Sequence, residues 1–327
     1  MEQLPFERIK REILIKKEAE TSSEYGKKPG DRSVEELISY GVVNINKQQG
    51  PTSHQLSDHV KKILNISKAG HGGTLDPNVT GVLPIALDRA TRVVQALLKS
   101  GKEYVCLMHL HKSIDEKKIH ETANSFVGKI KQLPPIRSAV KRQERVREIY
   151  YLKILEINDK DVLFKVGCEA GTYIRKLCFD WGNKLKIGAH MQQLIRTKLG
   201  VFNDGNWFSL IDLKDAYVNW KEKKNEEIKK IILPFEKAIE HLGKIWVFDS
   251  CVNNLTCGSD LYVNGISKLN SNINKDELVS VLSLKNELIL LGKTKMSSKE
   301  MIDKKEGVAV KTDAVFMERN VYPRMNK

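Results

Sequence analysis

A short stretch near residue 70 brings together residue types that could do chemistry. Residues 68–77 read KAGHGGTLDP, so His71 and Asp76 share a loop that contains three glycines. Glycine lets a backbone bend sharply and approach a bulky partner closely, and Pro77 restricts the backbone just after the carboxylate. The stretch could hold a phosphate, a metal ion or a nucleophile, or it could be an ordinary turn.

Spacing argues against two of these possibilities. A P-loop needs a lysine and a hydroxyl residue after its last glycine, and no such lysine follows here. A dinucleotide-binding loop needs a glycine where Leu75 stands. One histidine and one aspartate five residues apart are too few ligands for a zinc site. A glycine-rich turn and a loop that carries a nucleophile both remain open.

The charge of the chain bears on that choice. Its 327 residues contain 55 Lys and Arg against 41 Asp and Glu, which gives a net charge of +14. Such a chain suits a polyanionic partner, most simply nucleic acid, although a generally basic proteome would give the same charge. A loop carboxylate is electrostatically unusual where a polyanion binds. It makes sense there if the carboxylate is a reagent.

The elements around this loop indicate an α+β fold. The length favours two domains, and strands and helices mix without a strict βαβ rhythm. Ser33 and Glu36 have the spacing of a capping box at the start of a helix. We expect helices over 33–41, 120–128 and 172–185, a loop running into an amphipathic helix over 50–64, strands over 41–47 and 104–110, and a hairpin of 147–157 with 161–169.

The last third of the chain has a different character. Residues 232–243 are predicted to form a helix and its stop. From about Lys244 the sequence contains short strands with turn residues at regular spacing, which predicts a separate small β-barrel of roughly 80 residues.

Cellular location follows from what the sequence lacks. It contains no apolar run of the ~18–20 residues that span a bilayer, and its first residues lack the apolar core of a signal peptide. We therefore expect an intracellular, cytoplasmic protein. The five cysteines form no C-x-x-C pair, so we expect reduced thiols that are mostly buried.

Several motifs, taken in order, resemble one family. Residues 70–92, GHGGTLDPNVTGVLPIALDRATR, resemble the core motif of the TruB/dyskerin family of RNA pseudouridine synthases. EAGTYIRKL at 169–177 and GAHMQQLIRTKLG at 188–200 resemble two later motifs of that family. Residues 265–323 resemble a PUA domain, a small RNA-binding barrel. The likeness runs from Val34 to Pro323, and the sequence around Tyr104 is most similar to the archaeal-type catalytic subunit of the H/ACA guide RNA–protein particle.

The resemblance implies an architecture. It predicts the pseudouridine synthase fold, an α+β arrangement with a mixed, largely antiparallel central sheet, flanking helices and a catalytic cleft, followed by the PUA β-barrel. It places the catalytic domain at 41–243 and the PUA RNA-binding domain at 244–327. Residues 1–40 would be an N-terminal extension packed on the C-terminal domain.

The resemblance also implies roles for individual residues. Asp76 would be the catalytic carboxylate and Arg175 its ion-pair partner. Tyr104 would stack on the target base and could take a proton. The residues that would hold or line the space of the flipped-out nucleotide are His71, Tyr173 and Leu194. Lys47 would be structural.

This chemistry suits these residue types. Pseudouridine forms when uracil leaves C1′, turns and rejoins through C5, so neither a redox cofactor nor a metal is required. A carboxylate could attack C1′ or remove a ribose proton, and a nearby arginine favours its ionised form. Extruding a stacked base costs a few kcal/mol, of which stacking on an aromatic ring returns ~1–3 kcal/mol. The glycines of the loop would leave room for the flipped nucleotide.

Partners follow from the same resemblance. It implies an H/ACA guide RNA, ribosomal RNA as substrate, possible tRNA, and small H/ACA protein subunits. Residues 137–147, RSAVKRQERVR, carry five Arg and Lys and could contact RNA or a protein, or be a solvated loop. A stand-alone synthase for the T-loop uridine of tRNA is the enzymatic alternative, and an RNA-binding scaffold without activity is the other.

Overall fold

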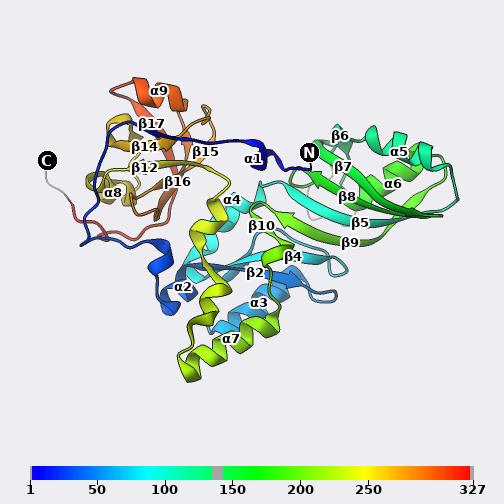
Figure 1. Cartoon of the computed structure of the whole chain (residues 1–327), viewed down its shortest axis with the longest axis horizontal. Coiled ribbons are helices and arrows are strands. Elements are labelled where there is room, and N and C mark those ends of the chain that lie inside the picture. Colours follow the sequence, from blue (N-terminus) through cyan, green and yellow to red (C-terminus); the bar gives the residue numbers. More distant parts are fainter. Residues whose placement is uncertain (1, 135–142, 325–327) are drawn as a thin grey trace. The chain divides into compact units, whose positions relative to one another are not determined.

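The computed structural model of the chain describes residues 2–134 and 143–324 (Figure 1). The chain forms two compact units. The first contains Val42–Ile231 together with the N-terminal residues through Arg8. The second contains Ile9–Gly41 and the residues from Ile232 onward, so the N-terminal segment after Arg8 folds with the C-terminal part of the chain.

The first unit is built on a strongly curved mixed sheet (Figure 1). Neighbouring strands run antiparallel except β4 and β9, which are parallel. Two short strands pair alongside this sheet, β3 (Ala69–His71) with β4 and β10 (Phe202–Asn203) with β9. The expected α+β class and mixed, largely antiparallel sheet are confirmed. The strand order is β2 (Gly41–Lys47), β4 (Thr80–Leu87), β9 (Ala189–Leu199), β5 (Lys102–Leu110), β8 (Asp161–Cys168), β7 (Arg145–Asn158) and β6 (Gly128–Gln132).

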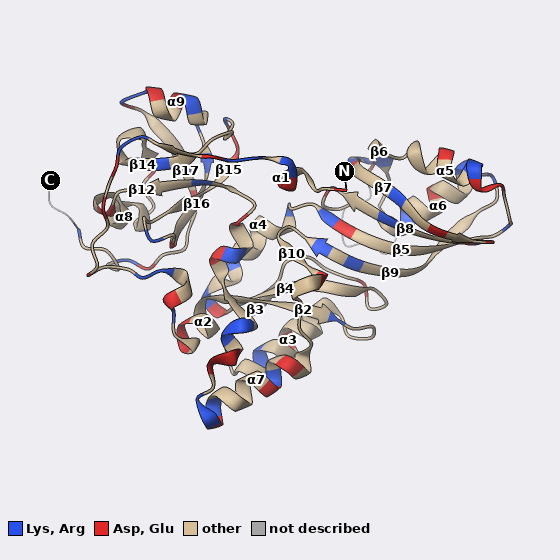
Figure 2. Ribbon diagram, viewed as in Figure 1, with Lys and Arg blue, Asp and Glu red and all other residues tan. Residues whose placement is uncertain are grey.

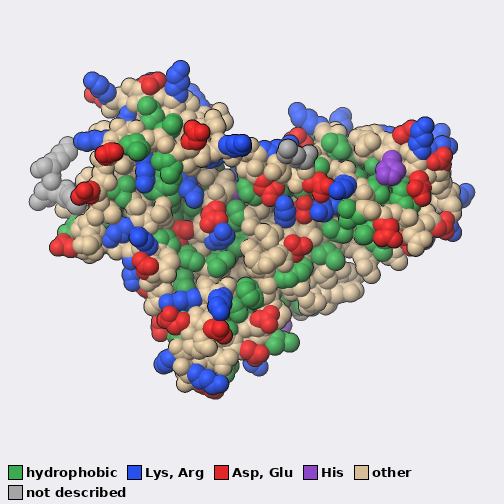
Figure 3. Space-filling view, in the orientation of Figure 1, with side chains coloured by type: hydrophobic (Ala, Val, Ile, Leu, Met, Phe, Trp, Pro, Cys, Tyr) green, Lys and Arg blue, Asp and Glu red, His purple; other side chains and the backbone are tan. Residues whose placement is uncertain are grey.

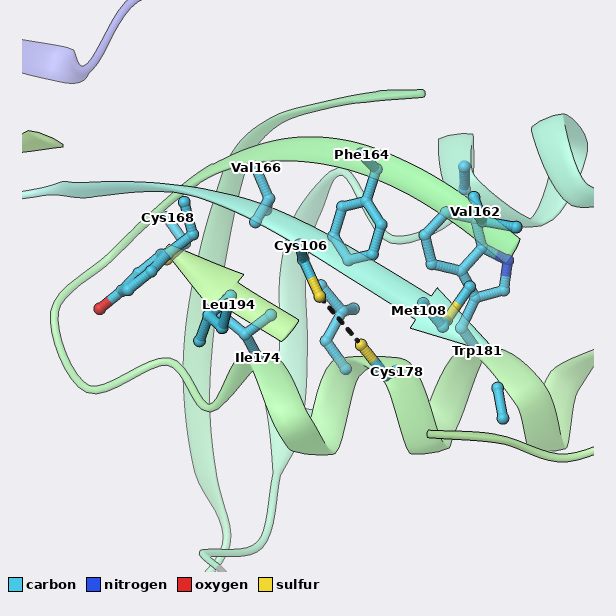
Figure 4. Close-up of a cluster of buried hydrophobic side chains, with 14 of the residues drawn as sticks. Cys106, Met108, Val162, Phe164, Val166, Cys168, Ile174, Cys178, Trp181 and Leu194 are labelled. Atoms are coloured by element: carbon cyan, nitrogen blue, oxygen red, sulfur yellow. Dashed lines mark hydrogen bonds between the residues drawn. The ribbon is translucent and has the colours of Figure 1, made fainter. Parts of the chain in front are cut away.

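Helix α6 (Ile174–Lys184) buries one face against this sheet. Its Leu177, Cys178 and Trp181 recur at helical spacing and enter the core. Figure 4 shows Cys178 facing Cys106 of β5, with 3.6 Å between the sulfur atoms. The other elements of this unit are α1 (Pro5–Arg8), α3 (Ser53–Leu64), α4 (Val94–Leu98), α5 (Glu116–Asn124), α7 (Leu210–Lys223) and the 3₁₀ turns η2 (Asp88–Val93), η3 (Asp204–Asn206) and η4 (Glu226–Lys230).

The second unit has its own sheet and core. Strand β1 pairs antiparallel with β14, so residues of the N-terminal segment form its edge. The strand order is β1 (Ile13–Ile15), β14 (Ile266–Asn270), β12 (Gly243–Val247), β15 (Leu278–Leu282), β16 (Leu288–Thr294), β17 (Val308–Val315) and β13 (Leu261–Tyr262). Its helices and 3₁₀ turns are η1 (Pro29–Asp31), α2 (Val34–Tyr40), η6 (Val263–Gly265), α8 (Asp249–Thr256) and α9 (Ser298–Asp303).

Helix starts were predictable where a capping box is present. The Ser33 hydroxyl accepts from the Glu36 N–H, and the Glu36 carboxylate accepts from the Ser33 N–H, so α2 begins as expected. Thr52 and Gln55 form the same reciprocal pair at the start of α3.

The helix expected at 232–243 is wrong. This segment forms strand β11 (Ile232–Pro234) and a single 3₁₀ turn, η5 (Phe235–Ile239). Glu236 is drawn inward by a bidentate ion pair with Arg32, whose two N–O distances are both 2.7 Å. The carboxylate is buried together with Phe235 and Ile239, so a charged side chain that an amphipathic helix would present to water is turned into the protein instead.

The cysteines are free thiols, as expected, and the basic residues are spread over the structure. Cys106, Cys168 and Cys178 are buried and all five thiols are free. Basic residues occur on helices and strands of both units (Figure 2), and on the face seen in Figure 3 they are interspersed with acidic ones. Across the described ranges, no helix is both long and apolar enough to cross a membrane.

Candidate active site

The loop after β3 holds Asp76 through backbone anchors on both sides. The Ser53 hydroxyl accepts from the Leu75 N–H at 2.8 Å and donates to the Leu75 carbonyl at 3.1 Å. On the other side, the Lys47 ammonium donates to the carbonyls of Pro77 at 3.0 Å and Val79 at 2.8 Å. Both anchors are buried, so the backbone around Asp76 is fixed while its side chain stays half exposed.

Lys47 therefore holds the backbone of the loop and also places a positive charge near Asp76. Its ammonium donates three hydrogen bonds to backbone carbonyls, and the third acceptor is the Gln48 carbonyl at 3.0 Å. Burial lowers the pKa of Lys47, and the charge of Asp76 acts in the opposite direction. A buried cation below the loop thus favours a negative charge on it.

Two glycines of the loop, Gly72 and Gly73, lie close to other side chains of the protein. A Cβ on Gly72 would lie 3.1 Å from the Leu97 side chain. A Cβ on Gly73, whose φ is +149°, would lie 3.6 Å from the Arg196 guanidinium. The missing side chains let the loop pack closely on the fold.

Arg175 and Asp76 form an ion pair. Arg175 lies in the first turn of α6, and its Nη2 is 2.5 Å from the Asp76 carboxylate. The two side chains are 58% and 53% exposed. The structure thus brings together the two residues that the sequence places in one site, at a position open to a large ligand.

Tyr173 lies immediately before α6 and is held by a neighbouring strand. Its N–H donates to the Gln132 side-chain carbonyl at 2.9 Å, and the Gln132 amide donates back to the Tyr173 carbonyl at 3.2 Å. Gln132 is the last residue of β6 and is buried. This reciprocal clamp fixes the backbone one residue before α6 begins.

Tyr104 and Leu194 lie on adjacent strands and share one hydrophobic cluster. Tyr104 is on β5 and Leu194 on β9, and both are less than a tenth exposed. Burial raises the pKa of the Tyr104 phenol, so it is neutral at physiological pH.

His71 has an unusual environment. Its ring packs edge-on against His54, with 4.8 Å between ring centroids. Both ring nitrogens are buried, and neither has a hydrogen-bond partner in the part of the chain that the structure describes. Burial lowers the pKa of His71, which favours the neutral imidazole.

Arg196 was missed by sequence reasoning. It is 1% exposed, lies opposite Tyr104 on the neighbouring strand and donates to backbone carbonyls of the Asp76 loop and of β4. The one available signal was an arginine inside the apolar strand that ends LIRTKL. Of the basic stretch 137–147, residues 137–142 lie outside the described residues, and Arg145 and Arg147 belong to β7.

Family models match most of the chain. Residues 61–174 match the TruB family pseudouridylate synthase N-terminal domain, and residues 175–240 match the tRNA pseudouridylate synthase B C-terminal domain. Residues 243–316 match a PUA domain and residues 2–57 a DKCLD domain. Fold and domain content together define a pseudouridine synthase, which is an RNA isomerase.

Two archaeal relatives align with this chain over nearly its full length. A probable tRNA pseudouridine synthase B of Pyrococcus furiosus is 53% identical over 97% of this chain and 94% of its own length. That of Nanoarchaeum equitans is 52% identical over 98% and 92%. The chain belongs to the TruB family of pseudouridine synthases, as its motifs predicted.

Solved structures give the same result. The chain matches a crystal structure of a Cbf5–Nop10–Gar1 complex with a TM-score of 0.94 and 53% identity, over 99% of both chains. It matches an H/ACA ribonucleoprotein bound to a substrate RNA containing 2′-deoxyuridine with a TM-score of 0.92 and 50% identity, over 98% of this chain and 99% of the other.

Proposed function

We propose that this chain isomerises uridine to pseudouridine in ribosomal RNA as the catalytic subunit of a guide-RNA-directed H/ACA particle. The observation that carries the proposal is the half-exposed Asp76–Arg175 pair, held at 2.5 Å on a loop whose backbone is anchored on both sides of Asp76. Residues 41–243 would do the chemistry and residues 244–327 would bind RNA, with residues 1–40 as an extension of the latter.

Asp76 is the proposed reagent in this scheme. Its carboxylate would attack C1′ or remove a ribose proton, and the Arg175 guanidinium would keep it ionised until the target nucleotide arrives. Arg175 can release Asp76 without leaving a buried charge, because both side chains are more than half exposed.

The pocket residues would act on the flipped base. Tyr104 would stack on uracil and exchange a proton with it, with Leu194 beside it in the same apolar cluster. Tyr173 would close the wall at the start of α6. His71 would contact the flipped nucleotide. Its two buried ring nitrogens have no hydrogen-bond partner among the described residues, and a polar group of the nucleotide would supply one.

The proposed partners come from the similar structures. Those structures hold Cbf5 with Nop10 and Gar1, and an H/ACA particle with substrate RNA. This chain matches them over 98–99% of its length, so we propose that it assembles with a guide RNA and small H/ACA proteins of that kind, in the cytoplasm.

A second function is favoured by the names of the relatives. The Pyrococcus and Nanoarchaeum proteins are called tRNA pseudouridine synthase B, so the chain could also modify tRNA without a guide. The third possibility, a non-catalytic scaffold, does not account for the anchored Asp76 loop or the ion pair.

Two assays distinguish the guide-directed synthase, the stand-alone tRNA synthase and the non-catalytic scaffold. The purified chain is incubated with ribosomal RNA fragments and with tRNA, with and without guide RNA and small subunits, and pseudouridine is quantified. Modification of ribosomal RNA without guide would overturn guide dependence. Asp76→Asn in the assembled particle should abolish modification at unchanged RNA binding; persistent activity would refute the catalytic assignment, whereas lost activity excludes the scaffold.

A further inference from the structure

Arg196 is a buried cation whose hydrogen bonds reach strand β4 and the loop that carries Asp76. Its Nε donates to the Val82 carbonyl of β4 at 2.8 Å, and its Nη2 donates to the Gly73 carbonyl of the Asp76 loop at 3.0 Å. A buried charge is costly unless it is well hydrogen-bonded. With 1% of its surface exposed, Arg196 is not a contact for RNA phosphate.

The Tyr104 side chain is the neighbour of Arg196 across the sheet. The two residues lie opposite each other on β9 and β5, and each acts on the pKa of the other. A guanidinium has donors and no acceptor, so the phenol oxygen is the acceptor when the two groups bond. The phenol proton is then left for another acceptor.

We propose that Arg196 is a positioning residue for Tyr104 and for the loop that carries Asp76. One rigid guanidinium sets the spacing between the Gly73 backbone and the Tyr104 hydroxyl, and it turns the exchangeable proton of the phenol toward the target base. The inference rests on the proposed function for its substrate, but the Arg196–Tyr104 contact can be tested without RNA.

Electrostatics supports the geometry. Burial raises the pKa of Tyr104, whereas the charge and hydrogen bond of Arg196 act to lower it. The other titratable groups that act on the phenol are Cys168 of β8 and Asp76, and both act to raise its pKa. Arg196 is thus the group that stabilises a phenolate at this position if Tyr104 gives up its proton.

A lysine could not replace Arg196 fully. Its ammonium is a compact point charge, whereas Nε and Nη2 of the planar guanidinium donate to carbonyls of two different segments. Arg196→Lys therefore keeps the charge and loses the geometry, and Arg196→Gln keeps planar donors and loses the charge. The matched control is Lys198→Met, which removes a cation on the same strand that pairs with Glu7 instead of Tyr104.

The kinetic test is a double-mutant cycle with Tyr104→Phe. Single-turnover rates are measured as a function of pH in the assembled particle. Arg196→Lys should slow the reaction by about ten-fold or more when Tyr104 is present and by less than about two-fold in the Tyr104→Phe background. Arg196→Gln should in addition displace the alkaline limb of the pH profile upward, and Lys198→Met should leave that limb in place.

Equal losses in both backgrounds, with an unmoved alkaline limb, would show that Arg196 is merely structural and would overturn the proposal. If the Arg196 variants do not fold, NMR of the protein labelled in its arginine side chains decides. Tyr104→Phe should shift the Arg196 Nε and Nη resonances and leave those of Arg175 unchanged. Unmoved Arg196 resonances would refute the contact itself, whatever RNA the enzyme modifies.

Discussion

The guanidinium of Arg175 and the carboxylate of Asp76 meet at 2.5 Å although they are 99 residues apart in the sequence. The pair is more than half exposed, and exposed ion pairs contribute only about 0–1 kcal/mol to stability. The pair therefore has little value as a structural link. Its position between an anchored loop and the start of a helix makes sense for chemistry.

Replacing Arg175 should separate activity from stability. Arg175→Met leaves Asp76 without its counter-charge, so we expect single-turnover pseudouridylation to fall by roughly 10²-fold while the melting temperature changes by less than about 2 °C. Arg175→Lys should retain part of the activity, because an ammonium keeps the charge but not the fork geometry. Exchanging the exposed Lys62 of α3 for methionine is the control. Full activity of Arg175→Met would contradict the assigned role.

Lys47→Met should impair both fold and reaction. The variant leaves the carbonyls of Gln48, Pro77 and Val79 without their shared donor, and unpaired buried polar groups cost about 1–3 kcal/mol each. We expect the free energy of unfolding in urea to fall by about 2–4 kcal/mol.

The maximal single-turnover rate of Lys47→Met should fall more than its affinity for RNA, since Asp76 moves while the RNA-binding surface stays. A variant that loses RNA affinity at an unchanged rate would instead make Lys47 a binding residue.

Ser53→Ala tests the other anchor of the loop. It removes the partner of both the N–H and the carbonyl of Leu75, so we expect a loss of about 1–3 kcal/mol in the free energy of unfolding together with a slower reaction. Ser57→Ala is the matched control, because the buried Ser57 hydroxyl donates within α3 to the carbonyl of Ser53. The anchor would be unimportant if the two variants behaved alike.

The sequence predicted the elements whose signals are local. In each capping box the two partners are three residues apart, Ser33 with Glu36 and Thr52 with Gln55, and the start of α2 was predicted correctly from the first of them. The same holds for the hairpin of β7 and β8, where alternation and the turn at Asp159 are adjacent in sequence.

Features that depend on distant contacts were not predictable. Two of the three carbonyls that hold Lys47, and both carbonyls that hold Arg196, belong to other segments, so the sequence around either residue does not identify these partners. The closeness of Gly72 and Gly73 to other side chains likewise depends on residues outside the loop. The turn at Phe235 was taken for a helix because its ion pair with Arg32 spans 204 residues.

Lys102 gives a pH dependence of stability with a definite sign. Lys102 is 6% exposed, and its ammonium donates to the carbonyls of Leu98 at 2.9 Å and Ser100 at 2.7 Å. Burial lowers the pKa of Lys102 from 10.5 to about 8. Between these values Lys102 is more protonated in the unfolded chain than in the folded protein, so its own contribution to the free energy of unfolding rises with pH. The thiols of Cys106 and Cys168, whose pKa values are raised from 9.0 in the fold, contribute in the opposite sense.

The difference in pKa corresponds to about 3 kcal/mol over the whole window. Urea unfolding between about pH 7.5 and 9.5, measured for the native protein and for Lys102→Met, gives the contribution of Lys102 as the difference between the slopes of the two curves. The raised pKa of Tyr150, about 12, acts mainly above this range. Lys102→Met should make the slope less positive, whereas Lys99→Met, which changes an exposed neighbour, should leave the slope unchanged. Parallel curves for Lys102→Met and the native protein would show that Lys102 stays protonated in the fold, because its carbonyl bonds then outweigh the desolvation of its charge.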